Sequence, residues 1–536
     1  MSCLDTRQRG NTLREIQTRA YDIVIVGGGI TGAGILRDAS LRGLNAILIE
    51  GDDFSSGTSS KSTKLIHGGI RYLAMGHIHV VREAARERKR VHDIAPHLAE
   101  PKWLTLPARN RLEWLKYKVG VMVYEQLGQV EAKDRHFDVS GTELAAHEPL
   151  LDRQGFPYAC VYREYLTDDS RLVLGNIRAG VSSGGTAINK LRVTGLIKDH
   201  GNVTGVRARC AMTGEEILVK AKVVINAAGP WVEEVCAYDG VDSPKSLVLS
   251  KGIHICVSRE TIPLSQMILT VTQDKRPVFL IPRGDVVYIG TTDSVYPGAN
   301  AWPEVLAEEA HYLYQPVAHY LGIVLSDADC IGSWAGLRPL IAQPGKSTKE
   351  ISRKDEIWIS DSGMITIAGG KLTGYRKMAE DTVDEACRFL GCSRPDPTDD
   401  IPLPGGDFEG RVEAVALEFT RRFPLPHKTA ARLASLYGAE CVDVAAKGPA
   451  PIGESDMIEG EVIWAVENEG ANSLEDLIYR RMRAAYYSPG QVGAILAPTA
   501  DLLANALDWS ADEKVRQIEN ARARLVADLA MIKAAS

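Results

Sequence analysis

The order of apolar and polar positions near the start of the chain predicts a strand, a glycine-rich turn, a helix and a second strand. After a polar tail, the β-branched run Tyr21–Val26 is typical of a buried strand. It leads into Gly27–Gly34, from which we predict a helix to about Arg42. A second apolar run, Asn45–Ile49, predicts another strand that ends at Glu50. These elements form a β-α-β unit of the expected size, about 30 residues.

Strand-like runs separated by turns continue through the middle of the chain, and the last part is predicted to be helical. A late strand, Met364–Ala368, meets two glycines and then a helix from about Thr373 to Leu390. Residues 393–406 are rich in Pro and Gly, which is typical of a linker. The strand-like runs of the middle part are Val203–Cys210, Glu216–Val219, Lys222–Asn226, Val278–Ile281 and Val286–Gly290.

The chain beyond the linker carries helix signals but no chemistry that its residues identify. Ser473 and Ser510 fit helix N-caps, each with an acidic residue three positions later. A core-facing stripe at helical spacing is predicted for Val515, Ile518, Leu525, Leu529 and Ile532. We expect this part to serve in packing or in forming a homodimer.

Composition places the chain among ordinary globular proteins of more than one domain. It has 536 residues, of which 45% are hydrophobic and 24% charged, with a formal net charge of −7. That length exceeds what one hydrophobic core usually supports, and the acidic balance argues against a general nucleic-acid binder. No apolar run approaches the roughly 18–20 residues that span a bilayer, and the start lacks a signal peptide's apolar stretch. Nine cysteines without a CxxC pair predict reduced thiols, so we expect a cytoplasmic protein without a metal site.

The glycines of the first turn predict a dinucleotide site. Gly27, Gly29 and Gly32 form GxGxxG between a strand and a helix, where the backbone and the positive helix end can bind a pyrophosphate. Glu50, at the end of the next strand, is placed to accept hydrogen bonds from ribose hydroxyls. Two later junctions, residues 222–231 and 367–376, could close over the same cofactor. Such a return of distant chain favours FAD over NAD.

Several longer motifs resemble one family. They are VGGGITGAG, SSKSTKLIHGGIRYL, TDDSRLVL, INAAGPW, IGTTD, GLRPL, SRKDEI, AGGKLTGYRKMAE and LPGG. In this order they are similar to the FAD-dependent (aerobic, quinone-linked) glycerol-3-phosphate dehydrogenases, from about residue 21 to 390, and the helical part fits the bacterial form. The resemblance implies FAD, oxidation of sn-glycerol 3-phosphate to dihydroxyacetone phosphate, and electrons passed to membrane quinone. Gly374 departs from the family's usual threonine, which puts one detail of the flavin or substrate contacts in question.

From this resemblance we expect an α/β flavoprotein with three parts. A discontinuous Rossmann-like FAD-binding domain carries an inserted antiparallel-sheet substrate domain, and an all-helical C-terminal domain follows. The expected FAD domain comprises residues 21–90, 155–245 and 330–392, after an N-terminal tail of residues 1–20. The expected substrate domain comprises residues 91–154 and 246–329. The linker is 393–406 and the helical domain 407–536.

A dianionic phosphate needs cations, and the resembling motifs contain four. They are Arg71, Arg338, Arg353 and Lys371. An arginine suits phosphate because its planar fork donates two parallel hydrogen bonds. Arg338 and Arg71 are ranked first by resemblance, and Arg338 also because it lies in an apolar stretch, where an unpaired charge is costly.

A base must take the hydroxyl proton, and His67 and His254 are the two candidates, because histidine titrates near neutral pH. The sequence does not choose between them, and a hydrogen-bonded core histidine remains the alternative for each. Tyr72 is a plausible donor to the substrate. The cofactor-binding residues that the fingerprint and the resemblance imply are Gly27, Gly28, Gly29, Gly32, Glu50, Thr58, Ser59, Ser60, Lys64, Leu65, His67, Gly68, Gly69, Ala228, Gly229, Gly370, Lys371, Leu372 and Thr373.

Segment 109–128 surrounds a short apolar patch with aromatic and basic residues. This suits an interfacial helix on an anionic lipid surface, and a buried helix of the substrate domain is an equally good interpretation. We therefore expect peripheral attachment to the inner face of the cell membrane, with this segment as the candidate anchor. The charged groups Arg82–Arg90 and Arg480, Arg481 and Arg483 are predicted to be solvent-exposed helix faces.

Three other functions share most of these motifs. A glycerol-3-phosphate oxidase would pass electrons to oxygen, and a related dehydrogenase would use another polyol phosphate such as erythritol phosphate. A catalytically inactive flavin-binding sensor or scaffold belongs to a different class. The phosphate-binding cations and both histidines argue against the inactive protein.

Overall fold

The predicted β-α-β unit forms the centre of a parallel sheet. The structure is a computed structural model that describes residues 2–68, 78–240, 243–297, 303–343 and 354–534. In it β1 (Ala20–Val26) pairs in parallel with β2 (Ala46–Ile49), and α2 (Ile30–Leu41) connects them. Within the described residues this sheet has the order β17-β18-β10-β1-β2-β7, with β9 and β8 extending it beside β10. The remaining strands are β7 (Thr186–Ile188), β8 (Leu191–Asp199), β9 (Asn202–Cys210), β10 (Glu216–Asn226), β17 (Glu356–Ile359) and β18 (Ile365–Ala368).

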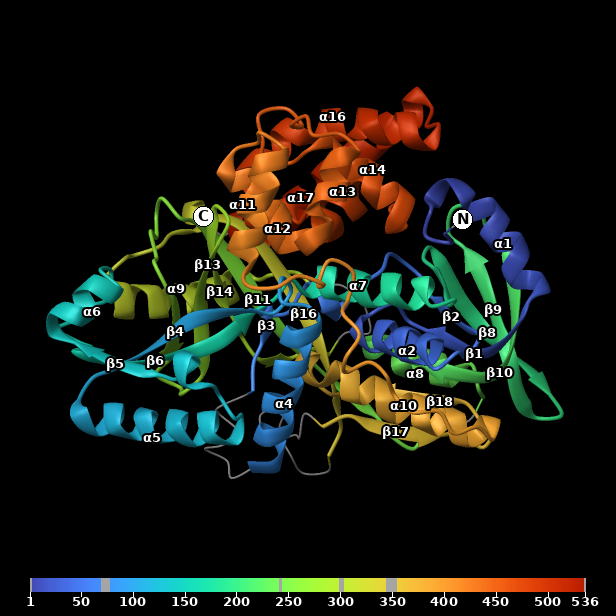
Figure 1. The fold of residues 1–536 in the computed structure, drawn as a ribbon, viewed down its shortest axis with the longest axis horizontal. Helices are drawn as coiled ribbons and strands as arrows, with labels where there is room; N and C mark the ends of the chain where they lie inside the picture. Colours follow the sequence, from blue (N-terminus) through green and yellow to red (C-terminus); the bar gives the residue numbers. More distant parts are fainter. Residues whose placement is uncertain (1, 69–77, 241–242, 298–302, 344–353, 535–536) are drawn as a thin grey trace.

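A second, mostly antiparallel sheet lies beside the first (Figure 1). Among the described residues its order is β15-β11-β14-β13-β12-β4-β6-β3, with β16 beside β11 and β5 beside β6. Its strands are β3 (Leu65–Ile66), β4 (Glu100–Ala108), β5 (Phe137–Ser140), β6 (Tyr158–Leu166), β11 (Leu247–Ser258), β12 (Met267–Val271), β13 (Pro277–Arg283), β14 (Val286–Gly290), β15 (Ser294–Val295) and β16 (Cys330–Ile341).

Strand pairing differs from the expected elements in two respects. The two predicted strands Glu216–Val219 and Lys222–Asn226 are one strand, β10, because Lys220 continues the alternation of exposed and buried side chains. Strands β6 and β16 lie in segments that we assigned to the FAD domain, but they hydrogen-bond within the second sheet. Among the described strands the chain therefore passes between the two sheets as often as the expected boundaries require, but at different residues.

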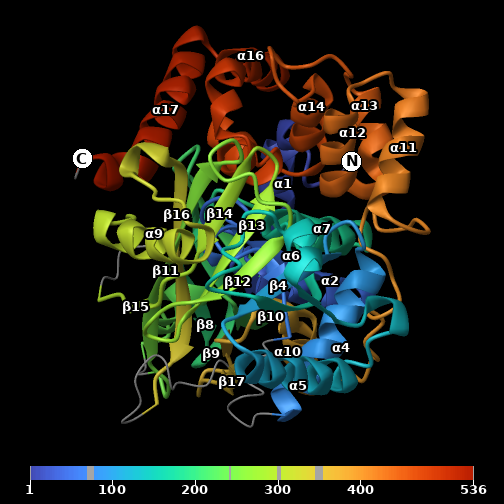
Figure 2. The same cartoon turned by 90° about the vertical axis from the view of Figure 1, so that its left-hand side faces the viewer.

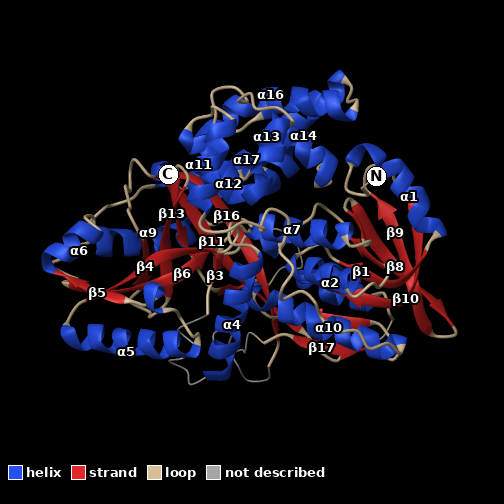
Figure 3. Cartoon of the chain, viewed as in Figure 1, coloured by secondary structure: helices blue, strands red, loops and turns tan. Residues whose placement is uncertain are grey.

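Helices cover both faces of the first sheet. Helix α2 packs with α7 (Asp169–Ser182) and α10 (Tyr375–Leu390) against one face, in a core with the apolar residues of β1 and β2. Residues of α1 (Arg9–Thr18) and α8 (Val232–Ala237) pack with the other face. The second sheet is bordered by α4 (Ile78–Ile94), α5 (Arg111–Leu127), α6 (Gly141–His147) and α9 (Ala307–Leu321). Figure 3 shows helices beside both sheets, with β8, β9 and β10 at the right-hand edge of the molecule.

A helical body that begins after the linker lies above both sheets (Figures 1 and 2). Its helices are α11 (Val412–Arg422), α12 (His427–Tyr437), α13 (Cys441–Ala446), α14 (Glu459–Asn468), α15 (Ala484–Tyr487), α16 (Pro489–Leu507) and α17 (Ala511–Lys533), with a π-helical turn at Asp476–Arg481. The stripe predicted for α17 is only partly buried. Ile532 is fully buried, but Val515 is half-exposed.

Buried ion pairs hold this helical body to the parts of the chain around the first sheet, which corrects the prediction that its arginines are solvent-exposed. Arg481 donates two hydrogen bonds of 2.8 Å to Asp53, just after β2. Arg483 binds Asp168 and Asp169 at the start of α7, at 3.0 and 2.7 Å. Arg480 also binds Asp53, and all three arginines are almost completely buried. The predicted surface stretch 82–90 likewise contains two buried residues, Glu87 and Arg88, which pair with Arg376 and Glu164.

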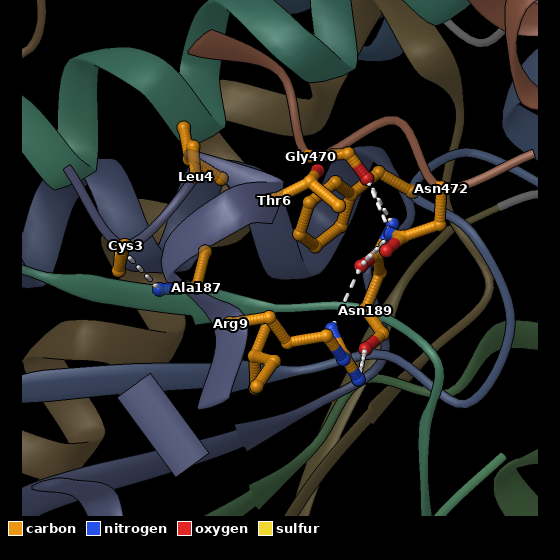
Figure 4. A pocket seen from close by; sticks show the side chains of 10 residues that line it. Cys3, Leu4, Thr6, Arg9, Ala187, Asn189, Gly470 and Asn472 are labelled. Carbon is orange, nitrogen blue, oxygen red and sulfur yellow. Dashed lines mark hydrogen bonds between the residues drawn. The ribbon is translucent and has the colours of Figure 1, made fainter. Parts of the chain in front are cut away.

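The N-terminal segment meets the helical body at a small cavity of about 10 Å³ (Figure 4). Asn189, which follows β7, links the three parts that meet there. Its Nδ2 donates to Gly470 O at 2.9 Å, and its Oδ1 accepts from Asn472 at 3.0 Å. Arg9 Nη2 donates to Asn189 O at 2.6 Å. The cavity is about the size of one water molecule, so it serves packing.

Helix α5 has one packed face and one exposed apolar face. On the packed face of α5 the side chains of Val121 and Tyr124 are buried, and Trp114 Nε1 donates to Asp138 at 2.9 Å. The large apolar side chains on the other side are half-exposed or more, namely Leu112, Leu115, Val119 and Met122. In both views α5 lies on the side of the molecule opposite to the helical body (Figures 1 and 2). Among the described residues no helix is long and apolar enough to span a bilayer.

Candidate active site

The turn between β1 and α2 forms a cradle of backbone amides. A Cβ atom on Gly32 would lie 1.9 Å from Gly27 O, so a side chain there is impossible without moving the turn. Ile30 N, in the first turn of α2, donates to Ser59 Oγ at 3.0 Å. The helix N-terminus therefore has Ser59 beside it and backbone amides directed outward, the arrangement that binds a pyrophosphate.

Glu50 lies at the end of β2 beside this cradle. Its Oε2 accepts from Gly28 N at 2.7 Å, and its Oε1 accepts from Asp52 N at 2.7 Å. Burial raises the pKa of this carboxyl above its usual value. Each oxygen keeps a second lone pair, which can accept a ribose hydroxyl.

One cavity of about 1200 Å³ connects the cradle to the second sheet. This exceeds the 300–1,000 Å³ or so of most small-molecule pockets, so a dinucleotide and a smaller molecule can share it. The cradle, Glu50 and the length of the cavity fit FAD. The predicted residues that line it are Gly27, Gly29, Glu50, Thr58, Ser59, Leu65, His67, Ala228, Gly229, His254, Arg338, Gly370, Lys371, Leu372 and Thr373.

The Arg338 side chain crosses over Gly252, where β11 lies between β14 and β16. Arg338 pairs with Ser250 between β16 and β11, and a Cβ atom on Gly252 would lie 2.2 Å from Arg338 Nη2. The guanidinium donates to Thr291 Oγ1 at 2.9 Å and to Thr292 O at 3.3 Å. Its side chain remains 23% exposed toward the cavity. The hydrogen bonds to Thr291 and Thr292, just after β14, thus orient the Arg338 guanidinium at the cavity wall.

His254 lies on β11 two residues after Gly252, and its ring is buried. It stacks on Trp334 at a centroid distance of 4.9 Å, and its Nε2 is 3.0 Å from Thr63 Oγ1. Burial, reinforced by the charges of Lys64 and Arg338, holds the pKa of His254 well below its usual value. The imidazole is therefore neutral at neutral pH and retains a lone pair. His67 also lines the cavity, 6.3 Å from the Phe279 ring between centroids.

Some predicted residues lie behind the cavity wall or outside the described residues. Lys64 does not line the cavity: its Nζ is 3.1 Å from Asp169, and burial lowers the pKa of Lys64 to about 8. Gly28, Gly32, Ser60 and Gly68 support the wall without lining it. Gly69, Arg71, Tyr72 and Arg353 lie outside the described residues.

The structure adds residues to the wall that we did not assign from the sequence. Thr291 and Thr292 belong to the IGTTD motif, and Trp231 to INAAGPW, so those motifs were the available signal. Thr63 likewise belongs to SSKSTKLIHGGIRYL, whereas Arg276, Tyr162, Glu164 and Phe279 have no motif that indicates them. Among the described residues, no group of three metal-ligating side chains is placed to hold a metal ion.

Comparisons with known proteins agree with this site. Residues 22–376 match the model of the FAD dependent oxidoreductase family, and residues 397–514 match the C-terminal domain of alpha-glycerophosphate oxidase. The chain is 36% identical over 526 residues to an aerobic glycerol-3-phosphate dehydrogenase of Staphylococcus aureus, covering 95% of this chain and 94% of that protein.

Two solved structures are similar to this chain, one in sequence and fold and the other in fold. A glycerol-3-phosphate dehydrogenase from Bacillus halodurans complexed with FAD superposes with a TM-score of 0.83 at 32% identity, covering 99% of both chains. An L-alpha-glycerophosphate oxidase from Mycoplasma pneumoniae with FAD bound reaches a TM-score of 0.52 at 18% identity, covering 72% of this chain and 99% of that one. The second likeness extends to the fold alone.

Proposed function

Since the chain belongs to the FAD-dependent glycerol-3-phosphate dehydrogenase family, we propose that it oxidises sn-glycerol 3-phosphate to dihydroxyacetone phosphate and passes the electrons to membrane quinone. One observation carries this proposal. A cradle for FAD, the arginine Arg338 and the neutral His254 line the same cavity. The motifs in the sequence predicted FAD as the cofactor. The match to the FAD dependent oxidoreductase family and the relative complexed with FAD agree with this prediction.

The residues of the cavity suit the three requirements of the reaction. FAD, when bound, accepts the hydride from the carbinol carbon. Arg338 offers a charge-assisted fork to the phosphate, and His254 is neutral, so it can take the hydroxyl proton. We assign the base to His254 rather than His67, because His254 lies on the strand that pairs with Arg338's strand.

Other predicted contacts complete the proposed site. Lys371 lines the cavity and is proposed as a further phosphate-binding cation. Arg71, Tyr72 and Arg353 keep their proposed roles in substrate binding on the resemblance alone. The cofactor contacts are proposed for the lining residues, beginning with Gly29, Ser59 and Glu50.

The proposed acceptor requires access from a lipid surface. The exposed apolar residues of α5 support attachment to the inner face of the cell membrane, and Val119 and Val123 also line the cavity. The mouth of the cavity thus lies beside an apolar surface flanked by Lys116. Arg109 and Arg111, near the start of α5, supply further charge for anionic lipids.

Anaerobic titration of the FAD-loaded protein tests the proposal. Glycerol 3-phosphate should bleach the flavin absorbance, and erythritol phosphate or glycerol should bleach it much more slowly. Quinone in vesicles should then restore the colour faster than air-saturated buffer. Faster restoration by oxygen would make the protein an oxidase, and faster bleaching by erythritol phosphate would change the substrate. A flavin that no polyol phosphate reduces would leave only a flavin-binding protein.

A further inference from the structure

A carboxyl group that the proposed dehydrogenation does not use lies in the cavity wall. Glu164 is on β6 and is 2% exposed, yet it lines the cavity. Its Oε1 accepts from Tyr124 Oη at 3.1 Å, and its Oε2 is 3.3 Å from Arg88 Nη1. Burying a carboxylate is costly even when it is paired, so an ionisable group in a cavity wall is a candidate functional group.

The neighbours of Glu164 connect it to the helix at the cavity mouth. Tyr124 belongs to α5, and its Oη accepts from Arg88 at 2.6 Å and from Gly68 N at 3.0 Å. Gly68 follows His67, which lines the same cavity. The network therefore joins α4, α5, β6 and the chain beside His67.

Described charged and titratable groups around Glu164 come from α4, α5, β4 and β6 itself, and His67 follows β3, which pairs with β6 beside Glu164. Arg88 of α4 and Tyr124 of α5 contact it directly, and Tyr162 precedes it on the same face of β6. Lys102 of β4 is its partner in register, but Lys102 Nζ pairs with Glu100. Burial outweighs Arg88 and Tyr124 and raises the pKa of Glu164 to about 7. The carboxyl is therefore partly protonated at neutral pH.

The cavity wall that leads away from Glu164 along the second sheet carries apolar side chains. Tyr162 lies two residues before Glu164 on β6, and Leu106, Leu269 and Phe279 follow further along on β4, β12 and β13. Val123 of α5 lines the same cavity. This lining suits a lipophilic ring whose oxygen reaches one polar group.

We propose that Glu164 donates a proton to the quinone that reoxidises the flavin, an inference that rests on the proposed function. Reduction of a quinone to a quinol adds two electrons and two protons. The reduced flavin supplies a hydride, which carries both electrons and one proton. The Glu164 O–H bond breaks and a new O–H bond forms on the quinone oxygen, which completes the quinol. Arg88 and Tyr124 then stabilise the carboxylate until water returns the proton.

Separating the two half-reactions tests this role in the FAD-loaded protein. Glu164→Gln should slow reoxidation by quinone at least tenfold, because an acid group typically contributes 10²–10⁴-fold. Flavin reduction by glycerol 3-phosphate should stay within about twofold, as should reoxidation by ferricyanide, which takes electrons without protons. In the wild type the quinone rate should fall as pH rises through about 7, where the acid form is lost. Glu164→Asp should restore part of the rate.

A matched control and a second readout separate this role from a structural one. Glu125→Gln removes a mostly buried carboxylate of α5 that binds His136 outside the cavity, and it should leave all rates unchanged. Infrared spectra of the FAD-free protein should show a carboxyl band that titrates near pH 7 and is absent from Glu164→Gln. If Glu164→Gln keeps the wild-type rates and pH profile, or if the wild-type protein shows no such band, Glu164 is not the proton donor. Either outcome would leave the proposed function unaffected. If quinone fails to reoxidise the wild-type flavin, the proposed acceptor fails and this role falls with it.

Discussion

At the residue scale, Arg338 tests whether the cavity binds a phosphate. Arg338→Ala removes a charge-assisted fork, and each such hydrogen bond is worth roughly 1.5–3 kcal/mol. Because 1.4 kcal/mol is about a factor of ten, single-turnover flavin reduction by low glycerol 3-phosphate should fall about ten- to a hundredfold or more. Lysine should restore only part of the rate, since a point charge does not reproduce the fork.

The control for Arg338 is glycerol, which lacks the phosphate. Its slow reaction should barely change in Arg338→Ala, and added phosphite should speed the glycerol reaction of the wild type but not that of the variant. Arg338 also binds Thr291 and Thr292, so FAD content and Tm are measured first. Equal losses with both substrates would assign Arg338 to the fold.

The same scale decides between the two histidines. His254→Asn should slow flavin reduction about 10²–10⁴-fold, whereas His67→Asn should cost less, because only His254 lies beside Arg338's strand. The low pKa of His254 keeps the free ring neutral down to acidic pH, so the free enzyme should lose activity only well below pH 6.5. The pH dependence of kcat/KM measures this. A larger effect from His67→Asn would reverse the assignment.

At the element scale, α5 is the proposed contact with the membrane. Leu115 and Met122 are half-exposed, so replacing both with Glu leaves the packed face intact, whereas Val121 is buried and unsuitable. Full burial of one such side chain is worth roughly 1.5–3 kcal/mol. Sedimentation with anionic vesicles should therefore weaken at least tenfold, while flavin reduction by substrate stays unchanged.

Two exposed apolar residues on the opposite side of the molecule provide the control for α5. Leu417 is on α11 and Val526 on α17, two helices of the helical body. Leu417→Glu with Val526→Glu therefore adds the same charge away from α5 and should not alter vesicle binding. Equal effects of both double variants would mean that charge, rather than α5, governs attachment.

At the scale of the whole molecule, the buried arginines fix the helical body to the FAD-binding sheet. Asp53→Asn removes the carboxylate that Arg480 and Arg481 share. Arg480 keeps its pair with Asp476 at 2.6 Å, so the loss falls mainly on Arg481, and breaking a buried ion pair typically costs about 3–5 kcal/mol. The folded protein holds the pKa of Asp53 well below its usual value, because Arg481 and Arg480 outweigh its burial. This contribution is therefore complete above about pH 5 and is lost as pH falls.

Denaturant unfolding at pH 7 and at pH 3 tests this prediction. The difference in free energy of unfolding between wild type and Asp53→Asn should be smaller at pH 3 than at pH 7. FAD should also bind more weakly, since Asp53 follows Glu50 in the same loop. Asp93→Asn is the matched control, because Asp93 pairs with Lys89 on the exposed face of α4. That pair is worth at most about 1 kcal/mol. Equal losses in both variants would contradict the proposed role of the buried cluster.

What the sequence predicted well was local. The strand-glycine-helix-strand unit depends on residues within one short segment, and its glycines and Glu50 determine a dinucleotide cradle by their own geometry. The longer motifs also identified the family and FAD, because each motif is a contiguous stretch of chain.

What only the tertiary structure decided depends on neighbours far apart in the chain. Arg481 and Asp53 are 428 residues apart, so no local pattern could show that these arginines are buried rather than exposed. Glu164 has its partners in Arg88 and Tyr124, 76 and 40 residues away. Burial and pKa arise from the groups that surround a side chain in space, so the sequence determined the cradle and the cofactor, whereas the fold decided the charge states and the shape of the cavity.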